Sequence, residues 1–64
     1  MDKAMDIANI EKLTAAVATL EERIATADTS TKSGRRAVAI WSENLRGSKW
    51  AISKIQERID RDEY

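Results

Sequence analysis

Cysteine and histidine are both absent from this chain of 64 residues. Without cysteine no disulfide can form, and without either residue the usual zinc ligands are missing. Histidine, the side chain that most often serves as general base, and the nucleophilic thiol of cysteine are therefore also missing. We expect no metal site, no cofactor and no enzymatic activity.

Proline is absent too, and glycine occurs only at Gly34 and Gly47. No apolar run approaches the roughly 20 residues that cross a bilayer. The first ten residues, MDKAMDIANI, lack the cationic start and apolar stretch of a signal peptide. We expect a cytoplasmic protein without membrane association.

The short length limits how much surface the chain can bury. A chain of this size forms one domain, here residues 1–64, and buries only about 60% of its unfolded surface. Small domains usually need disulfides, a metal or a partner subunit. With the first two excluded, a partner subunit or unusually good helix packing is required.

Apolar residues in the first half recur at alternating spacings of three and four, which is typical of a coiled-coil seam. This stripe consists of Ile10, Leu13, Val17, Leu20, Ile24 and Ala27. Met5, Ile7 and Ala8 are expected to extend the apolar surface toward the N-terminus, in poorer register.

The second half has a stripe with the same spacings, interrupted by one polar residue. It consists of Val38, Trp41, Leu45, Ser48, Ile52, Ile55 and Ile59. The segment ADTSTKSGRR between the stripes combines hydroxyl residues with Gly34, which predicts a turn and a new helix start capped by Ser33 or Ser30.

These patterns predict an all-α fold, an antiparallel helical hairpin with coiled-coil-like seams. We expect helix 1 at about residues 3–28, the turn at about 29–33 and helix 2 at about 34–61. A lone hairpin covers each stripe from one side only. We therefore predict a homodimer that forms a four-helix bundle, with self-association through Ile10, Leu13, Val17, Leu20, Ile24, Val38, Trp41, Leu45, Ile52, Ile55 and Ile59.

Charge is unevenly distributed although the net charge is zero. Residues 1–31 carry a net charge of −3 and residues 32–64 carry +3. We expect the two halves to pair, with Asp28 and Glu21 approaching Arg35 and Arg36 beside the turn.

The segment 32–54 is strongly basic, with six basic residues and only Glu43 as an acidic one. Such a cluster binds phosphates in nucleic-acid-binding proteins, and Trp50 is available to stack on a base. The sequence pI of about 6.2 is far below the value above 9 that is typical of such proteins, so nucleic acid is the less favoured partner. The candidate phosphate contacts are Arg35, Arg36, Arg46 and Lys49.

The two tryptophans of WSENLRGSKW are nine residues apart, which is about half a revolution of a helix. If Trp41 lies on the seam, Trp50 lies on the opposite face. Gly47 one turn earlier leaves a shallow notch beside the indole, and Arg46 can lie over the ring. The predicted partner-binding patch consists of Ile40, Glu43, Arg46, Gly47, Trp50 and Lys54. The competing interpretation, which ranks first for Trp50 itself, is that this residue packs against the other protomer at the self-association surface.

A small chain without catalytic groups is most simply a non-enzymatic regulator that binds a larger protein as an adaptor, antagonist or inhibitor. In size and composition it resembles small phage- or plasmid-encoded modulators of host proteins. The alternatives are a nucleic-acid-binding regulator that uses the basic segment 32–54, and a structural assembly element.

Overall fold

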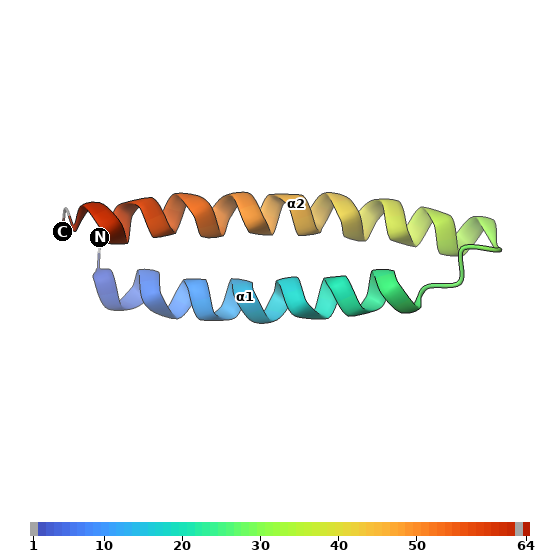
Figure 1. Ribbon diagram of the computed structural model, residues 1–64, viewed down its shortest axis with the longest axis horizontal. Coiled ribbons are helices and arrows are strands. Elements are labelled where there is room, and N and C mark those ends of the chain that lie inside the picture. Colours follow the sequence, from blue (N-terminus) through green and yellow to red (C-terminus); the bar gives the residue numbers. More distant parts are fainter. Residues whose placement is uncertain (1, 63) are drawn as a thin grey trace.

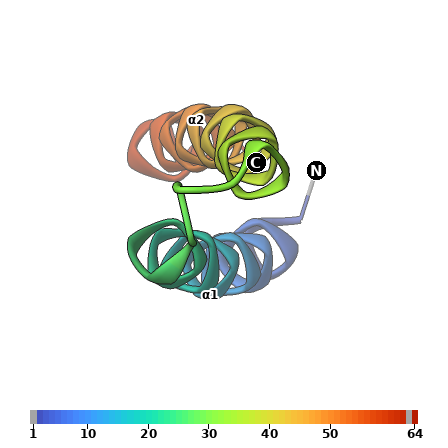
Figure 2. The same cartoon turned by 90° about the vertical axis from the view of Figure 1, so that its right-hand side faces the viewer.

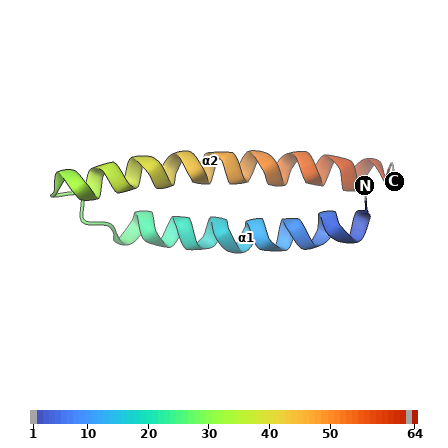
Figure 3. The same ribbon diagram turned by 180° about the vertical axis from the view of Figure 1, so that it is seen from behind.

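Two antiparallel α-helices joined by a short turn form the fold of the computed structural model, which describes residues 2–62 and residue 64 (Figure 1). Helix α1 spans Lys3–Thr26 and helix α2 spans Lys32–Arg61. The predicted all-α helical hairpin is confirmed. Its Cα atoms extend over 48 × 14 × 14 Å. The end-on view and the view from behind show the helices side by side along their whole common length (Figures 2 and 3).

Polar side chains begin both helices. The Asp2 carboxylate accepts a hydrogen bond from the Ala4 amide at 2.9 Å, which satisfies one of the free N–H groups at the start of α1. The hydroxyl of Thr31 does the same for the amide of Gly34 at 2.9 Å. The predicted cap at Ser33 or Ser30 is therefore wrong. Ser30 instead donates its hydroxyl to the Asp28 carboxylate within the turn.

The ends of the helices next to the turn differ from the predicted limits by two residues each. Helix α1 ends at Thr26 because Ala27 has an extended backbone. Helix α2 begins at Lys32 because Thr31, with its extended backbone, is already in position to cap.

The turn packs closely against the first turn of α2 at Gly34. A Cβ atom on Gly34 would overlap the backbone carbonyl oxygen of Asp28, so no side chain fits there without moving the backbone. The Arg35 guanidinium donates to the Thr29 carbonyl at 3.0 Å and holds the turn from the other side. Gly47 is different, since a Cβ atom there would meet nothing within 4 Å.

Two ion pairs at the open end of the hairpin define the register of the helices. The Asp6 carboxylate contacts Arg58 at 2.9 Å, and Lys3 contacts Asp62 at 2.9 Å. In an antiparallel pair, residues at the same level have numbers with a constant sum, here 64 to 65. On this register Trp41 lies level with Ile24, and the start of α2 extends past the end of α1, as Figure 1 shows.

The two stripes lie along the interface between the helices, which covers them only in part. Every member of both stripes is partly buried, and no apolar side chain in the described part of the chain is fully buried. The expected extension through Met5 and Ile7 is wrong, since their exposed fractions are 63% and 44%. Asp6 lies between them and is the buried residue at this level.

Neither helix carries an apolar stretch long enough to cross a membrane, within residues 2–62 and residue 64.

The two glycines of α2 provide a matched test of the packing at the turn. Gly47→Ala should raise the free energy of unfolding by about 0.5–1 kcal/mol, because alanine favours helix and the added methyl meets nothing. Gly34→Ala should lower it, because the methyl displaces the Asp28 carbonyl. Urea unfolding followed by circular dichroism at one protein concentration measures both. A shift of the same sign in the two variants would contradict this account.

Candidate functional site

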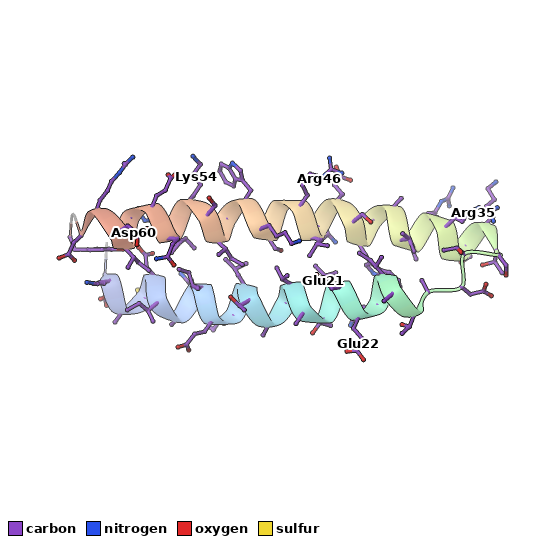
Figure 4. The ribbon with its side chains drawn as sticks, in the orientation of Figure 1. Glu21, Glu22, Arg35, Arg46, Lys54 and Asp60 are labelled. Atoms are coloured by element: carbon purple, nitrogen blue, oxygen red, sulfur yellow. The ribbon has the colours of Figure 1, made fainter. Side chains whose placement is uncertain are left out.

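The predicted partner-binding residues lie in one row along the side of α2 that faces away from α1. We call this row, formed by Ile40, Glu43, Arg46, Gly47, Trp50 and Lys54, the outer ridge. All six residues are exposed. In Figure 4 the side chains of Arg46 and Lys54 point away from α1, while Glu22 on α1 points away from α2. The row arises because its members follow helical spacings offset from the stripe that faces α1.

Trp50 is the largest exposed apolar side chain of the outer ridge, with an exposed fraction of 65%. The ammonium of Lys54 lies 5.8 Å from the centre of its ring, within the range of a cation–π interaction. The prediction that Arg46 would cover the ring is thus not met: the neighbour one turn later takes this place. Lys54 also lies 3.6 Å from the carboxylate of Glu57.

Ile40 and Gly47 give the outer ridge its apolar and hollow parts. Ile40 has an exposed fraction of 54%. Gly47 has open space where a side chain would stand, so the helix backbone itself is accessible one turn before Trp50. A large aromatic group, an accessible backbone and charged neighbours on a rigid helix are features of protein-binding surfaces.

The basic residues of the segment 32–54 form no ion pair with an acidic residue of α1 among the residues that the structure describes. Lys32, Arg35, Arg36, Arg46 and Lys49 are all exposed, and no ion pair involves them among the residues that the structure describes. Lys32 and Arg36, with Ser33, line a shallow hollow where α2 begins.

The expected approach of Asp28 and Glu21 to Arg35 and Arg36 is therefore wrong. Asp28 is bound instead by the hydroxyl and the amide of Ser30, and these hydrogen bonds hold the pKa of its carboxyl below the usual value. Arg35 donates to the Thr29 carbonyl. Because α2 begins beyond the end of α1, its first basic residues have no helix opposite them.

The most strongly connected polar group in the molecule was not predicted. Asp6 has an exposed fraction of 3% and is the one buried residue among those described. Arg58 donates to both of its carboxylate oxygens, from Nη2 at 2.9 Å and from Nε at 3.1 Å. The hydroxyl of Tyr64 donates to the same carboxylate.

These contacts change the titration of all three groups. The hydrogen bonds from Arg58, and then that from Tyr64, lower the pKa of Asp6 from 3.8 to about 2. The hydrogen bond to Asp6 raises the pKa of Arg58. Loss of water contact, followed by the hydrogen bond to Asp6, raises the pKa of Tyr64. The cluster therefore stays ionised as a carboxylate–guanidinium pair over the physiological pH range.

The sequence contains a signal for this cluster. Stepping back four residues from Ile10, as the alternating spacing requires, leads to Asp6, a charged residue at a position of the stripe. A charge that is buried between two helices has to be paired with an opposite charge. Arg58, next to Ile59 of the second stripe, is the basic residue of α2 that lies level with Asp6.

No protein-family model matches the chain, and neither the curated proteins nor the solved structures that we compared show a significant similarity to it. Among residues 2–62 and residue 64, no three carboxylates gather in a way that could hold a metal ion. The outer ridge and the exposed basic residues of the segment 32–54 are the candidate binding surfaces.

The Asp6 cluster predicts a specific pH dependence of stability. The pKa of Asp6 is lower in the folded chain than in the unfolded one, so the carboxylate stabilises the fold above about pH 4. This stabilisation should be lost as the pH falls from about 4 toward 2, because the carboxylate then becomes protonated. Thermal unfolding as a function of pH measures the effect.

Asp6→Asn should lower the stability at neutral pH and flatten the profile between pH 4 and 2, because asparagine cannot pair with Arg58 as an anion. Glu22→Gln is the matched control, since this carboxylate is exposed, and it should leave the profile unchanged. An equally steep profile in Asp6→Asn would contradict the assignment.

Proposed function

We propose that the chain is a small, non-enzymatic regulator that binds another protein through the outer ridge of α2. The observation that carries the proposal is the position of Trp50, which is 65% exposed on the face of α2 opposite the stripe that packs on α1. The side of a helix that faces solvent is normally polar. Tryptophan, in contrast, is enriched among the interface residues that contribute most of the binding energy between proteins. Because the outer ridge lies on one helix, it presents its side chains with little loss of backbone entropy on binding.

We also propose that two hairpins associate through the open side of their stripes to form a four-helix bundle. Every stripe residue is only partly buried, and the chain has neither disulfides nor a fully buried apolar side chain in its described part. A second hairpin would cover what the first leaves exposed. The outer ridge lies on the opposite side of α2, so it stays exposed in such a bundle and can bind a regulated protein.

Binding of nucleic acid is the second candidate function. The observation in its favour is that Lys32, Arg35, Arg36, Arg46 and Lys49 form no ion pair within the described residues. Against it, Glu43 and Glu57 lie seven residues before and after Trp50, on the same side of α2. A phosphate backbone that followed this face would meet a carboxylate on each side of the indole. We therefore rank a protein partner first.

Association through the stripes predicts that helicity depends on protein concentration. Sedimentation equilibrium at high micromolar concentration should give a mass of at least two chains, and the helical circular dichroism signal should fall on dilution. Leu20→Asp should abolish the helical signal, because it places a charge without a partner among apolar groups. Ala18→Asp, at an exposed position of α1, should keep it. A monomer with full helicity would rule out the bundle.

Binding through the outer ridge predicts a selective loss of partner capture in Trp50→Ala. The immobilised chain should retain a host protein, which mass spectrometry identifies. The affinity for this protein should fall about 30-fold or more in Trp50→Ala, as it does when other residues that dominate a binding interface are truncated. Gly47→Arg should have the same effect because it fills the notch. Helicity should stay unchanged in both. Met5→Ala, which removes another exposed apolar side chain, should bind normally.

Two results would contradict this proposal. One is capture that survives Trp50→Ala. The other is a complex with nucleic acid tighter than the 10⁻⁴–10⁻⁶ M that is typical of non-specific binding. If such a complex weakened steeply with salt and was lost in an Arg35→Ala, Arg36→Ala double variant, the second candidate function would replace the first.

A further inference from the structure

The part of the outer ridge from Glu43 to Lys54 carries opposite charges at its two ends. Glu43 lies at one end and Lys54 at the other, with Gly47 and Trp50 between them. The spacings are four, three and four residues, so all four side chains belong to one row along α2. The row thus runs from a negative charge through a hollow and an aromatic group to a positive charge.

We propose that this outer ridge seats the outer ridge of a second copy of the chain, with the two α2 helices antiparallel. A two-fold axis between Gly47 and Trp50 places Trp50 opposite Gly47 of the second copy, and Gly47 opposite the second indole. The same rotation brings Glu43 to the level of the second copy's Lys54, and Lys54 to the level of its Glu43. One register therefore satisfies all four positions twice, as a closed two-fold interface requires.

The local structure around Gly47 and Trp50 fits this arrangement. Nothing lies within 4 Å of the place where a Gly47 side chain would be, so an incoming indole meets open space and can approach the backbone. The Trp50 side chain is 65% exposed and available for burial. Helical side chains lean toward the N-terminus of their own helix, so both indoles lean toward the two-fold axis and can pack against each other.

Two other arrangements of the same two helices bring like charges together at the middle of the contact. Placing Trp50 directly opposite its copy brings Glu43 to the level of the second Glu57, and Arg46 to the level of the second Lys54. A parallel arrangement with a two-fold axis sets each residue against its own kind. Opposite charges at close range across an interface favour binding, whereas like charges reduce the affinity. Of these three arrangements, charge complementarity favours the antiparallel register with Trp50 opposite Gly47.

A contact between two single helices is smaller than the 1,200–2,000 Å² buried in most stable interfaces. We therefore expect association that depends on protein concentration and ionic strength. The inference rests on the proposed function in that both treat the outer ridge as a protein-binding surface. The second copy occupies this surface until a regulated protein with matching chemistry displaces it.

Exchanging the two charges tests the pairing. Glu43→Lys and Lys54→Glu should each weaken the association about tenfold or more, because every exchange acts at two symmetric contacts. The double variant, Glu43→Lys with Lys54→Glu, should restore it. The two residues are eleven positions apart, about 16 Å along one helix, so they cannot pair within a chain. Rescue can then only come from contacts between chains.

The measurement is sedimentation equilibrium of the full chain at an ionic strength below about 0.1 M, where the Debye length exceeds about 10 Å. It follows the increase in mass beyond that of the proposed two-hairpin bundle, which is joined through the stripes and not through the outer ridge. Glu22→Lys and Lys12→Glu make the same charge changes at exposed positions of α1, and they should not change the association. Gly47→Leu should weaken it without any change of charge, by filling the hollow. Circular dichroism should show unchanged helicity in every variant, since the exchanged residues are exposed.

An association that the single exchanges leave unchanged, or that the double variant fails to restore, would overturn the inference. These outcomes are distinct from failure of the proposed function. Capture of a host protein that depends on Trp50, without any charge-dependent self-association, would leave the proposed function standing. Charge-dependent self-association without capture of any other protein would support the inference alone.

Discussion

The contact between Asp6 and Arg58 sets the geometry on which the rest of the hairpin depends. An apolar stripe alone allows two helices to slide by one heptad, because each stripe repeats every seven residues. A bidentate carboxylate–guanidinium contact at one level removes this freedom, since a slipped helix would leave a buried charge without a partner. The register then follows: Trp41 lies level with Ile24, and α2 begins beyond the end of α1.

In this register the two sides of α2 differ. Its inner side carries the stripe that packs on α1, and its outer side carries an exposed indole, an accessible glycine backbone and charges of both signs. Helix α1 contains no aromatic residue, and its exposed residues include the alanines Ala4, Ala8, Ala15, Ala18 and Ala25. Binding is therefore expected on α2. Each stripe is covered only by the other helix and stays partly exposed. The inner side of α2 is therefore the basis of the proposed bundle, and its outer side is the basis of the proposed binding surface.

The helices and their facing sides were predictable because apolar spacing is a strong periodic signal. Alternating steps of three and four from Ile10 to Ala27 and from Val38 to Ile59 select one face of each helix, and all of these residues are partly buried. The spacing also separates Trp41 from Trp50. The same geometry places Trp50 on the face of α2 opposite Trp41, and its side chain is exposed there.

Local choices among equivalent side chains were not predictable in this way. Ser30, Thr31 and Ser33 can all cap a helix, and the spacing of apolar residues does not decide among them; in the structure Thr31 is the cap. Arg46 and Lys54 are equally far from Trp50 along α2, so the spacing does not decide which of them covers the ring. Asp6 was not predictable from apolar spacing, because it continues the stripe of α1 four residues before Ile10 with a charged side chain.

The central claim is that α2 presents two opposed faces, with Trp41 packed on α1 and Trp50 accessible to a partner. Acrylamide quenching of tryptophan fluorescence tests it most directly, with Trp50 observed in a Trp41→Phe variant and Trp41 in a Trp50→Phe variant. Both variants should also carry Glu43→Lys, so that pairing between outer ridges does not shield the indole. We predict that Trp50 is quenched far more strongly than Trp41. Equal protection of the two indoles would show that Trp50 belongs to the packed interior of an assembly, and would contradict the account.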